Sequence, residues 1–167
     1  QLAIAGLMIA ITVILSYQNI YLFPPRSGRI TLRFIPMIFS GILLGPTLGT
    51  IIGGASDPLI YFMTLGSPGM YFPGYMLTNM VIGFFPGLII GKNIEKENKF
   101  SLILKVALIS LLSFAVTIFL DSFWLSITRG KGFWYYVASR TLPNLIQTGI
   151  TFVAILVLTT RIKKTYR

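Results

Sequence analysis

The chain has 167 residues and a formal net charge of +10, yet only 11% of its residues are charged and 54% are hydrophobic. Its mean hydropathy is +0.81, and a domain of this length cannot hide so much apolar surface in one water-soluble core. The composition therefore excludes an ordinary soluble domain and indicates an integral membrane protein.

Missing residue types narrow the function further. The sequence has no cysteine and no histidine, which excludes disulfides and thiolate metal sites and removes the commonest general base and metal ligand. We therefore expect no metal, no cofactor and no enzymatic activity. Nor do we expect a nucleic-acid partner. The first residues show no basic segment followed by a small-residue cleavage site, so we predict no signal peptide.

Apolar runs that suit a hydrocarbon core of about 30 Å predict about six helices. The first three are expected over residues 2–22, 34–44 and 47–63, and Gly45 and Pro46 break the pattern between the last two. Residues 64–74, TLGSPGMYFPG, are rich in glycine and proline and carry no charge. They predict an ordered loop.

The second half of the chain alternates long apolar runs with short polar segments. Further helices are expected over residues 75–90, 101–127 and 137–160, with a polar segment at 92–99, a loop at 128–136 and a basic tail at 161–167. We predict an all-α integral membrane protein, in which six transmembrane helices form a compact bundle and a single domain over residues 1–167.

Lysine and arginine in the short loops predict the orientation, because cytoplasmic loops are enriched in them. Placing residues 92–99 and the tail in the cytoplasm also places both termini there, as six spans require. The other three connections then share the outer side, where an excess of basic residues is unusual. These basic residues are Arg26, Arg29, Arg33, Arg129, Lys131 and Arg140.

Basic residues on the outer side need an anionic partner. Asp57 and Asp121 are the only acidic residues outside the segment 92–99, so this side is short of negative charge. An arginine fork binds carboxylate or phosphate through two parallel hydrogen bonds, which makes a soluble anion with acidic groups a suitable ligand. Contact with lipid headgroups or water is the plainer alternative for any one of these arginines.

Asp57 is the most informative single residue. It lies inside an apolar helix, in the sequence GGASDPL, directly before Pro58. The proline ring removes a backbone donor and disfavours helical geometry at the preceding residue. A carboxylate there can accept two parallel N–H bonds, such as those of a 2-aminopyrimidinone edge. An internal salt bridge to Arg33 or Arg140 is the alternative.

Other polar side chains repeat at helical spacing and should face the inside of the bundle. In the helix 137–160 they are Ser139, Arg140, Asn144, Gln147 and Thr148. Thr78 and Asn79 are placed to do the same in the helix 75–90. Ordinary helix-to-helix hydrogen bonding is the alternative, and it is the slightly preferred interpretation of Asn79.

Aromatic residues gather in or beside the outer loops, where they would either line a cleft for a flat heterocycle or form an interfacial belt. They are Tyr71, Phe72, Tyr75, Trp124, Phe133, Trp134, Tyr135 and Tyr136. Small residues four apart predict grooves for close helix contact, either within the chain, which is commoner, or with a partner. The grooves comprise Gly6 and Ala10, Gly49 and Gly53, and Gly83, Gly87 and Gly91.

Two segments within residues 33–91 carry a resemblance to a known family. They are RFIPMIFSGILLGPTLGTIIGGASDPL and GMYFPGYMLTNMVIGFFPGLIIG, with weaker support from ASRTLPNLIQTG at 138–149. The chain resembles the substrate-binding S component of an energy-coupling factor (ECF) vitamin transporter, most closely the folate-specific branch.

The resemblance implies a multi-pass subunit of the bacterial plasma membrane that captures a vitamin from outside. It would deliver the vitamin through a complex with a transmembrane coupling subunit and two cytoplasmic ATPases. Residues 23–32 would gate the pocket, and Gly6 and Ala10 would contact the coupling subunit, although the family usually has alanine at both positions. The chain has no phosphate-binding loop, so ATP hydrolysis is expected in the partners.

The three parts of folate suit these candidates. Its two carboxylates would bind the arginines, its central aromatic ring would lie against the aromatic residues, and the amino-pyrimidinone edge of its pterin head would bind Asp57. The candidate substrate-binding residues are Arg26, Arg29, Arg33, Asp57, Tyr71, Phe72, Asn79, Trp134, Tyr135, Arg140, Asn144 and Gln147. Pantothenate, biotin or riboflavin is the alternative ligand. A phospholipid-handling membrane enzyme and a structural membrane protein without a ligand are the alternative classes.

Overall fold

A computed structural model of the chain describes residues 1–21, 29–63, 71–91 and 98–165. The prediction of six helices is confirmed, and a pair of short strands accompanies them. The elements in chain order are α1 (Leu2–Ser16), β1 (Asn19–Tyr21), β2 (Arg29–Thr31), α2 (Phe34–Leu44), α3 (Pro46–Met63), α4 (Pro73–Ile89), α5 (Lys99–Arg129) and α6 (Phe133–Thr165).

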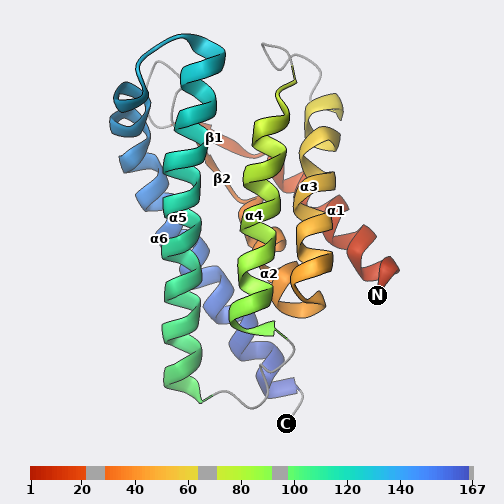
Figure 1. Ribbon diagram of the computed structural model, residues 1–167. Coiled ribbons are helices and arrows are strands. Elements are labelled where there is room, and N and C mark those ends of the chain that lie inside the picture. Colours follow the sequence, from red (N-terminus) through yellow and green to blue (C-terminus); the bar gives the residue numbers. More distant parts are fainter. Residues whose placement is uncertain (22–28, 64–70, 92–97, 166–167) are drawn as a thin grey trace.

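The ends of the helices fall into two groups (Figure 1). The end of α3, the start of α4 and the turn between α5 and α6 lie together at the top of the figure, and we call this the upper end of the molecule. The end of α4, the start of α5 and the end of α6 lie at the opposite, lower end. The prediction from lysine and arginine alternates the ends of α3 to α6 in the same way, and the placement of both termini in the cytoplasm stays a prediction.

The fold is all-α, as predicted, apart from one short pair of strands between α1 and α2 that the sequence analysis did not foresee. There β1 pairs antiparallel with β2, with Ile20 opposite Ile30, and α1 ends at Ser16 rather than at residue 22. The last turn of α1 has a hydrogen bond of the 3₁₀ type, in which Tyr17 N–H donates to the Ile14 carbonyl, three residues earlier, over 3.2 Å. The backbone N–H and C=O groups beyond this turn form hydrogen bonds between β1 and β2. Pairing with a distant segment therefore outweighs the local apolar pattern that predicted a longer helix.

Two predicted loops are shorter than expected. α5 ends at Gly130, whose φ of 71° is the left-handed conformation that glycine adopts readily, and α6 begins at Phe133. The aromatic residues that follow therefore lie in a helix rather than in the predicted loop 128–136. α4 begins at Pro73, because a proline in the first helical turn loses no intrahelical bond.

Glycines bring α3 and α4 into close contact. A Cβ atom on Gly49 would overlap the Gly83 carbonyl, one on Gly83 would overlap the Gly49 carbonyl, and one on Gly53 would overlap the Asn79 carbonyl. Backbone therefore lies directly on backbone along this pair of helices. The grooves predicted at Gly49 and Gly83 are used inside the chain.

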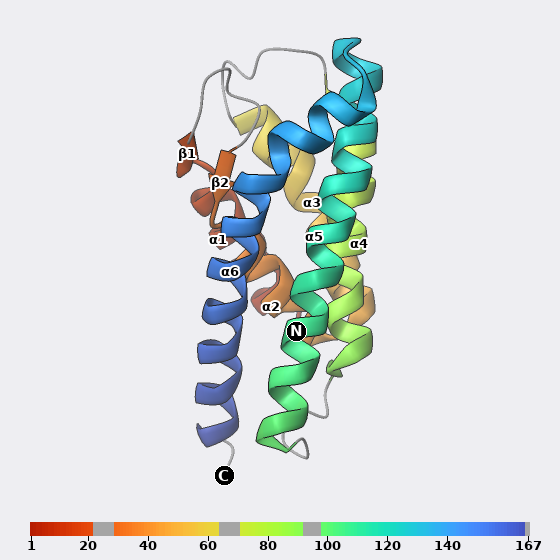
Figure 2. The ribbon, with the colours of Figure 1, turned by 90° about the vertical axis from the view of Figure 1, so that its left-hand side faces the viewer.

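The hydrophobic core lies around α2. α5 and α6 lie side by side near the upper end and separate toward the lower end, with α2 between them (Figure 2). Apolar side chains of α2, α4, α5 and α6 fill this space, namely Phe34, Met37, Ile38, Ile42, Ile82, Ile90, Leu102, Val106, Ile109 and Ile155.

Candidate ligand-binding site

A buried polar cluster joins α2, α3 and α4. Asn79 Nδ2 donates a 2.7 Å hydrogen bond to Asp57 Oδ1, and Arg33 Nη1 lies 3.9 Å from the same oxygen. The side chains of Arg33 and Asp57 are each 10% exposed, so little water screens their charges. The guanidinium of Arg33 also lies 5.1 Å from the centre of the Phe34 ring. Of the two salt bridges considered for Asp57, the structure shows the one with Arg33.

Tyr71 lies beside this cluster, two residues before α4 begins at Pro73. Its ring lies 5.2 Å from that of Tyr61 and 6.3 Å from that of Phe62, both near the end of α3. Its hydroxyl is buried and has no hydrogen-bond partner among the described residues. Burial and, secondly, the negative charge of Asp57 raise the pKa of Tyr71 above its usual value of 10.0, so the phenol stays protonated at neutral pH.

Aromatic packing connects α4 with α5. The Phe72 and Trp124 ring centres are 5.5 Å apart, and Trp124 Nε1 donates a 3.2 Å hydrogen bond to Thr78 Oγ1. Gly74 makes room for the indole, because a Cβ atom there would lie 2.5 Å from Trp124 and from Phe72. Thr78 directly precedes Asn79. This contact therefore holds the segment of α4 that carries an Asp57 partner.

A second ion pair joins α5 and α6. Arg140 Nη2 donates to Asp121 Oδ2 over 3.0 Å, and the two side chains are 14% and 9% exposed. Sequence analysis did not assign this partner to Arg140. The sequence could have indicated this pair. Gly130 lies about midway between Asp121 and Arg140, and two antiparallel helices joined by a short turn bring positions equally far from the turn together.

Gln147 links α6 to the strands. The backbone N–H of Thr31 in β2 donates a 2.6 Å bond to Gln147 Oε1, and Gln147 Nε2 donates to Thr151 Oγ1 over 3.3 Å. Asn144 lies one turn earlier on α6 and is 7% exposed. The inward orientation predicted for the polar strip of α6 is confirmed for Asn144 and Gln147, which are both buried.

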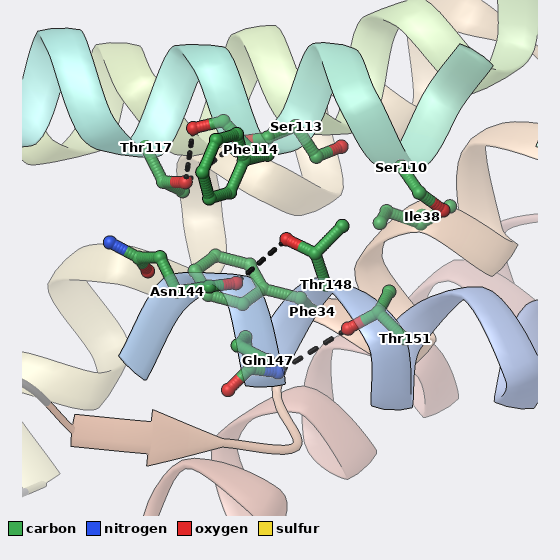
Figure 3. A pocket seen from close by; sticks show the side chains of 10 residues that line it. All are labelled: Phe34, Ile38, Ser110, Ser113, Phe114, Thr117, Asn144, Gln147, Thr148 and Thr151. Carbon is green, nitrogen blue, oxygen red and sulfur yellow. Dashed lines mark hydrogen bonds between the residues drawn. The ribbon is translucent and has the colours of Figure 1, made fainter. Parts of the chain in front are cut away.

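Below these residues lies a cavity of about 20 Å³ between α2, α5 and α6 (Figure 3). Most of the surface that faces this space is apolar, although the lining residues of α5 and α6 are mostly of polar types. The lining residues are Phe34, Ile38, Ser110, Ser113, Phe114, Thr117, Asn144, Gln147, Thr148 and Thr151. A space of this size holds about one water molecule. A vitamin-sized ligand would therefore need the helices or strands around it to move.

Four candidates remain, namely Trp134, Tyr135, Arg29 and Arg26. Trp134 is 74% exposed and Tyr135 is 44% exposed, with Lys131 Nζ lying 4.6 Å from the centre of the Tyr135 ring. Arg29 is the first residue of β2, where it pairs with Tyr21. Arg26 lies outside the described residues.

The small-residue face of α1 is exposed. A Cβ atom on Gly6 would meet no described atom within 4 Å, and Ala10 is also exposed. Apolar neighbours on the same helix share this exposure, with Leu7 at 58% and Ile14 at 65%. This groove, unlike those of α3 and α4, is not filled by any described part of the chain.

The polar clusters share one half of the molecule, because Asp57 lies late in α3, Asn79 early in α4, Asp121 late in α5 and Arg140 early in α6. Their charges form pairs and suit the recognition of an anion with a polar ring. No group of three or more side chains that could hold a metal ion occurs among the described residues.

The fold and these clusters define a class, a small helical membrane protein with charged groups buried toward one end. α5 and residues Phe133–Ile162 of α6 are long and apolar enough to cross a membrane. Residues 1–159 match the family described as ECF transporter, substrate-specific component. The chain therefore belongs to this family of transport subunits, and the resemblance found in the sequence is confirmed.

Individual relatives agree with this assignment. The folate transporter FolT of Clostridium novyi (strain NT) is 31% identical over 127 residues, which is 76% of this chain and 70% of the relative. A crystal structure of FolT bound with folic acid has a TM-score of 0.77 at 24% identity and covers 96% of this chain and 92% of that one. The S component for biotin of an ECF-type ABC transporter has a TM-score of 0.66 at 23% identity, over 99% of this chain and 89% of that one.

Proposed function

We propose that this chain is the folate-binding subunit of an ECF transporter and that it captures the vitamin outside the cell. The observation that carries the proposal is the 31% identity with a folate transporter over 76% of the chain. The chemistry of the polar clusters supports it, because Arg33 and Arg140 lie largely buried beside Asp57 and Asp121 in the same half of the molecule. ATP hydrolysis is assigned to the partner subunits.

All six helices cross the membrane in this proposal, with both termini in the cytoplasm. Support comes from the grouping of the helix ends (Figure 1) and from the basic residues near the lower end, such as Lys99, Lys105 and Arg161. A cysteine at Gly132 should react with an impermeant reagent in intact cells, whereas one at Asn98 should react only in opened cells. The reverse pattern would contradict this orientation.

Folate would bind with its pterin head near Asp57 and Asn79 and its carboxylates near the arginines. Arg33 and Arg140 are both held by aspartates in the present structure, so a ligand carboxylate would compete with or join those aspartates. Arg26 and Arg29 lie in the sequence segment 23–32 that would form the gate, and charge at the entrance to a pocket would act mainly on the association rate. The aromatic candidates Tyr71, Phe72, Trp134 and Tyr135 would stack against the ring system.

Folate and pteroate, which lacks the glutamate, provide the test. Arg33→Ala and Arg140→Ala should each weaken folate binding by about ten- to a hundredfold, because hydrogen bonds between charged groups contribute about 1.5–3 kcal/mol. Pteroate should lose much less, and Arg129→Ala serves as the matched control, because Arg129 is an exposed arginine at the last position of α5. Equal losses for both ligands would mean that the arginines act only through Asp57 and Asp121. Failure of the unaltered protein to bind folate would contradict the proposed function itself.

The coupling subunit would contact the exposed groove of α1. Gly6 leaves space that a helix of a partner can enter, and Ala10 continues it one turn further. Gly6→Leu should lower recovery of the complex with the coupling and ATPase subunits while folate binding by the isolated chain stays unchanged. Unaltered recovery would place the contact elsewhere.

Biotin is the second candidate ligand, because the S component for biotin has the same fold over 99% of this chain. Biotin has one carboxylate and no pterin edge. Binding of biotin would therefore depend on an arginine but would tolerate Asp57→Asn, whereas folate binding should be weakened by this change.

A further inference from the structure

The side-chain amide of Gln147 bonds to two other parts of the protein. Its Oε1 accepts a 2.6 Å hydrogen bond from the backbone N–H of Thr31, and its Nε2 donates to Thr151 Oγ1 over 3.3 Å (Figure 3). Gln147 is only 4% exposed. Asn144, one turn earlier on α6, is buried as well, but its Nδ2 makes no hydrogen bond to any described residue. Of these two amides, the one of Gln147 therefore has a protein partner for both its oxygen and its nitrogen.

The hydrogen bond from Thr31 to Gln147 holds the end of β2 against α6. The two residues are 116 positions apart in the sequence, and Thr31 is the last residue of β2, which lies beside α6 (Figure 2). Hydrocarbon offers a backbone N–H no partner, so such a group needs an acceptor from the protein. Gln147 provides this acceptor and fixes the point at which the chain leaves β2.

The link from β2 to α2 is very short. Only Leu32 and Arg33 lie between Thr31 and Phe34, the first residue of α2. The backbone N–H of Arg33 donates to Thr31 Oγ1 over 3.4 Å, which is a long hydrogen bond, and Ile35 N–H donates to the Leu32 carbonyl over 3.1 Å. Each residue spans at most about 3.3–3.6 Å, so two residues leave Arg33 little freedom once Thr31 is held. The position of Arg33 therefore depends on where α6 holds β2.

Arg33 belongs to the polar cluster around Asp57. Its Nη1 lies 3.9 Å from Asp57 Oδ1, the oxygen that accepts a 2.7 Å hydrogen bond from Asn79 Nδ2. An arginine fork binds a carboxylate through two parallel hydrogen bonds, and this geometry tolerates displacements of only about 0.5 Å. A residue that fixes the backbone of Arg33 therefore affects how well Arg33 can bind a ligand carboxylate.

We propose that Gln147 is a positioning residue for Arg33. By holding Thr31, it places the guanidinium of Arg33 where the carboxylate end of the ligand binds, and it does so without touching the ligand. This inference rests on the proposed function, because it names what positions one of the arginines assigned to folate. It gives Gln147 a different role from the direct ligand contact that the sequence suggested.

The affinities for folate and pteroate test this role. Gln147→Met keeps the length of the side chain and removes the amide. It should weaken folate binding by about three- to tenfold, as for the loss of one ordinary hydrogen bond, and should weaken pteroate binding much less. In an Arg33→Ala background the same change should cost nothing more, because no guanidinium remains to be positioned. Gln147→Asn, which is one methylene too short to reach Thr31, should give the same result and replaces the methionine variant if that variant does not fold.

Thr151→Val is the matched control. It removes the other hydrogen bond of the same amide and leaves the bond between Gln147 and Thr31 in place. It should lower the melting temperature, as Gln147→Met does, without changing the ratio of the folate and pteroate affinities. A loss of stability alone therefore cannot produce the expected pattern.

Amide hydrogen exchange, followed by NMR on the ligand-free protein in detergent, needs no vitamin. The backbone N–H of Arg33 should exchange faster in Gln147→Met than in the unaltered protein and in Thr151→Val, because the chain before α2 is no longer held. An unchanged exchange rate at Arg33 in Gln147→Met would overturn the positioning role whichever vitamin the chain binds.

Three binding results would also overturn it. They are an unchanged folate affinity in Gln147→Met, equal losses for folate and pteroate, and a loss that persists in the Arg33→Ala background. Failure of the unaltered protein to bind folate would instead contradict the proposed function, and the exchange rate at Arg33 would then decide the role of Gln147 alone.

Discussion

The contact between α3 and α4 differs in kind from the contact between α5 and α6. The α3–α4 contact is made by glycines, so that Gly49 and Gly83 place backbone against backbone. The α5–α6 contact instead contains the Asp121–Arg140 ion pair and, one turn farther from the upper end, the small cavity beside Asn144. One pair of helices is tightly packed, and the other is polar and incompletely filled.

The difference indicates which part of the molecule is the frame and which part can adapt. Close backbone contacts have no space in which to rearrange, because any shift opens a gap or causes an overlap. Ion pairs and hydrogen bonds can exchange one partner for another of the same chemistry, such as a ligand carboxylate. We therefore expect α3 and α4 to hold Asp57 and Asn79 in place while the α5–α6 side responds to the ligand.

The largest effect is expected from breaking the α5–α6 ion pair. Asp121→Leu leaves the charge of Arg140 buried without its partner, and removal of one member of a buried pair costs about 3–5 kcal/mol of unfolding free energy. The double variant Asp121→Leu with Arg140→Leu should recover much of that loss, because no charge remains unpaired. Thermal unfolding of both variants checks this, and a double variant less stable than the single one would contradict it.

An added methyl group should separate tight contacts from open ones. Gly49→Ala places a Cβ atom against the Gly83 carbonyl and should cost about 1–3 kcal/mol, because backbone cannot move aside as a side chain can. Gly149→Ala on α6 meets nothing within 4 Å in the described structure and should be neutral or slightly stabilising. Equal melting temperatures for the two variants would mean that α3 and α4 are not close-packed.

Trp124 tests the connection between the two halves. Trp124→Phe keeps an aromatic ring but loses the hydrogen bond to Thr78, so it should cost about 0.5–1.5 kcal/mol. Trp134→Phe removes an indole that is 74% exposed and should change stability very little. Chemical denaturation of the two variants measures both losses of unfolding free energy. Equal losses would mean that the Trp124–Thr78 contact does not stabilise the protein.

The smallest effect concerns pH. The pKa of Tyr71 is raised in the folded protein, so the unfolded chain loses its phenol proton first as the pH rises. The contribution of Tyr71 to the unfolding free energy is fully present below pH 10.0, the usual pKa of a tyrosine, and is lost as the pH rises through the higher pKa of the folded state. Tyr71→Phe should therefore lose less stability between neutral pH and pH values above 10 than the unaltered chain, as thermal unfolding in a buffer series would show. Parallel losses would mean that the hydroxyl titrates normally.

Sequence patterns located the helices well because apolar runs of membrane length and Gly–Pro breaks are local signals. The break at Gly45 and Pro46 and the end of α3 at Met63 were predicted at or within one residue of the observed bounds. The strand pair was missed because its partner segments are separated along the chain and their pairing is decided by contacts that local pattern cannot show. The start of α6 was predicted four residues too late, because the left-handed Gly130 lets the chain turn from α5 into α6 within a shorter loop than expected.

The candidate site was predictable in its residue types but not in its pairings. A carboxylate and arginines in apolar surroundings are rare enough to stand out, which is how Asp57, Arg33 and Arg140 were found. Which aspartate binds which arginine depends on how α5 and α6 pack against α3 and α4, and the pairing of Asp121 with Arg140 appears only in the structure. The orphan amide of Asn144 is likewise a property of the packed cavity rather than of the sequence.

Native mass spectrometry can show directly which vitamin the chain binds. The purified chain would be incubated with equal amounts of folate, biotin, pantothenate and riboflavin, freed of unbound ligand and examined by native mass spectrometry. The account predicts that the retained mass is that of folate, with one molecule per chain. Retention of biotin or another of these vitamins in place of folate would contradict it.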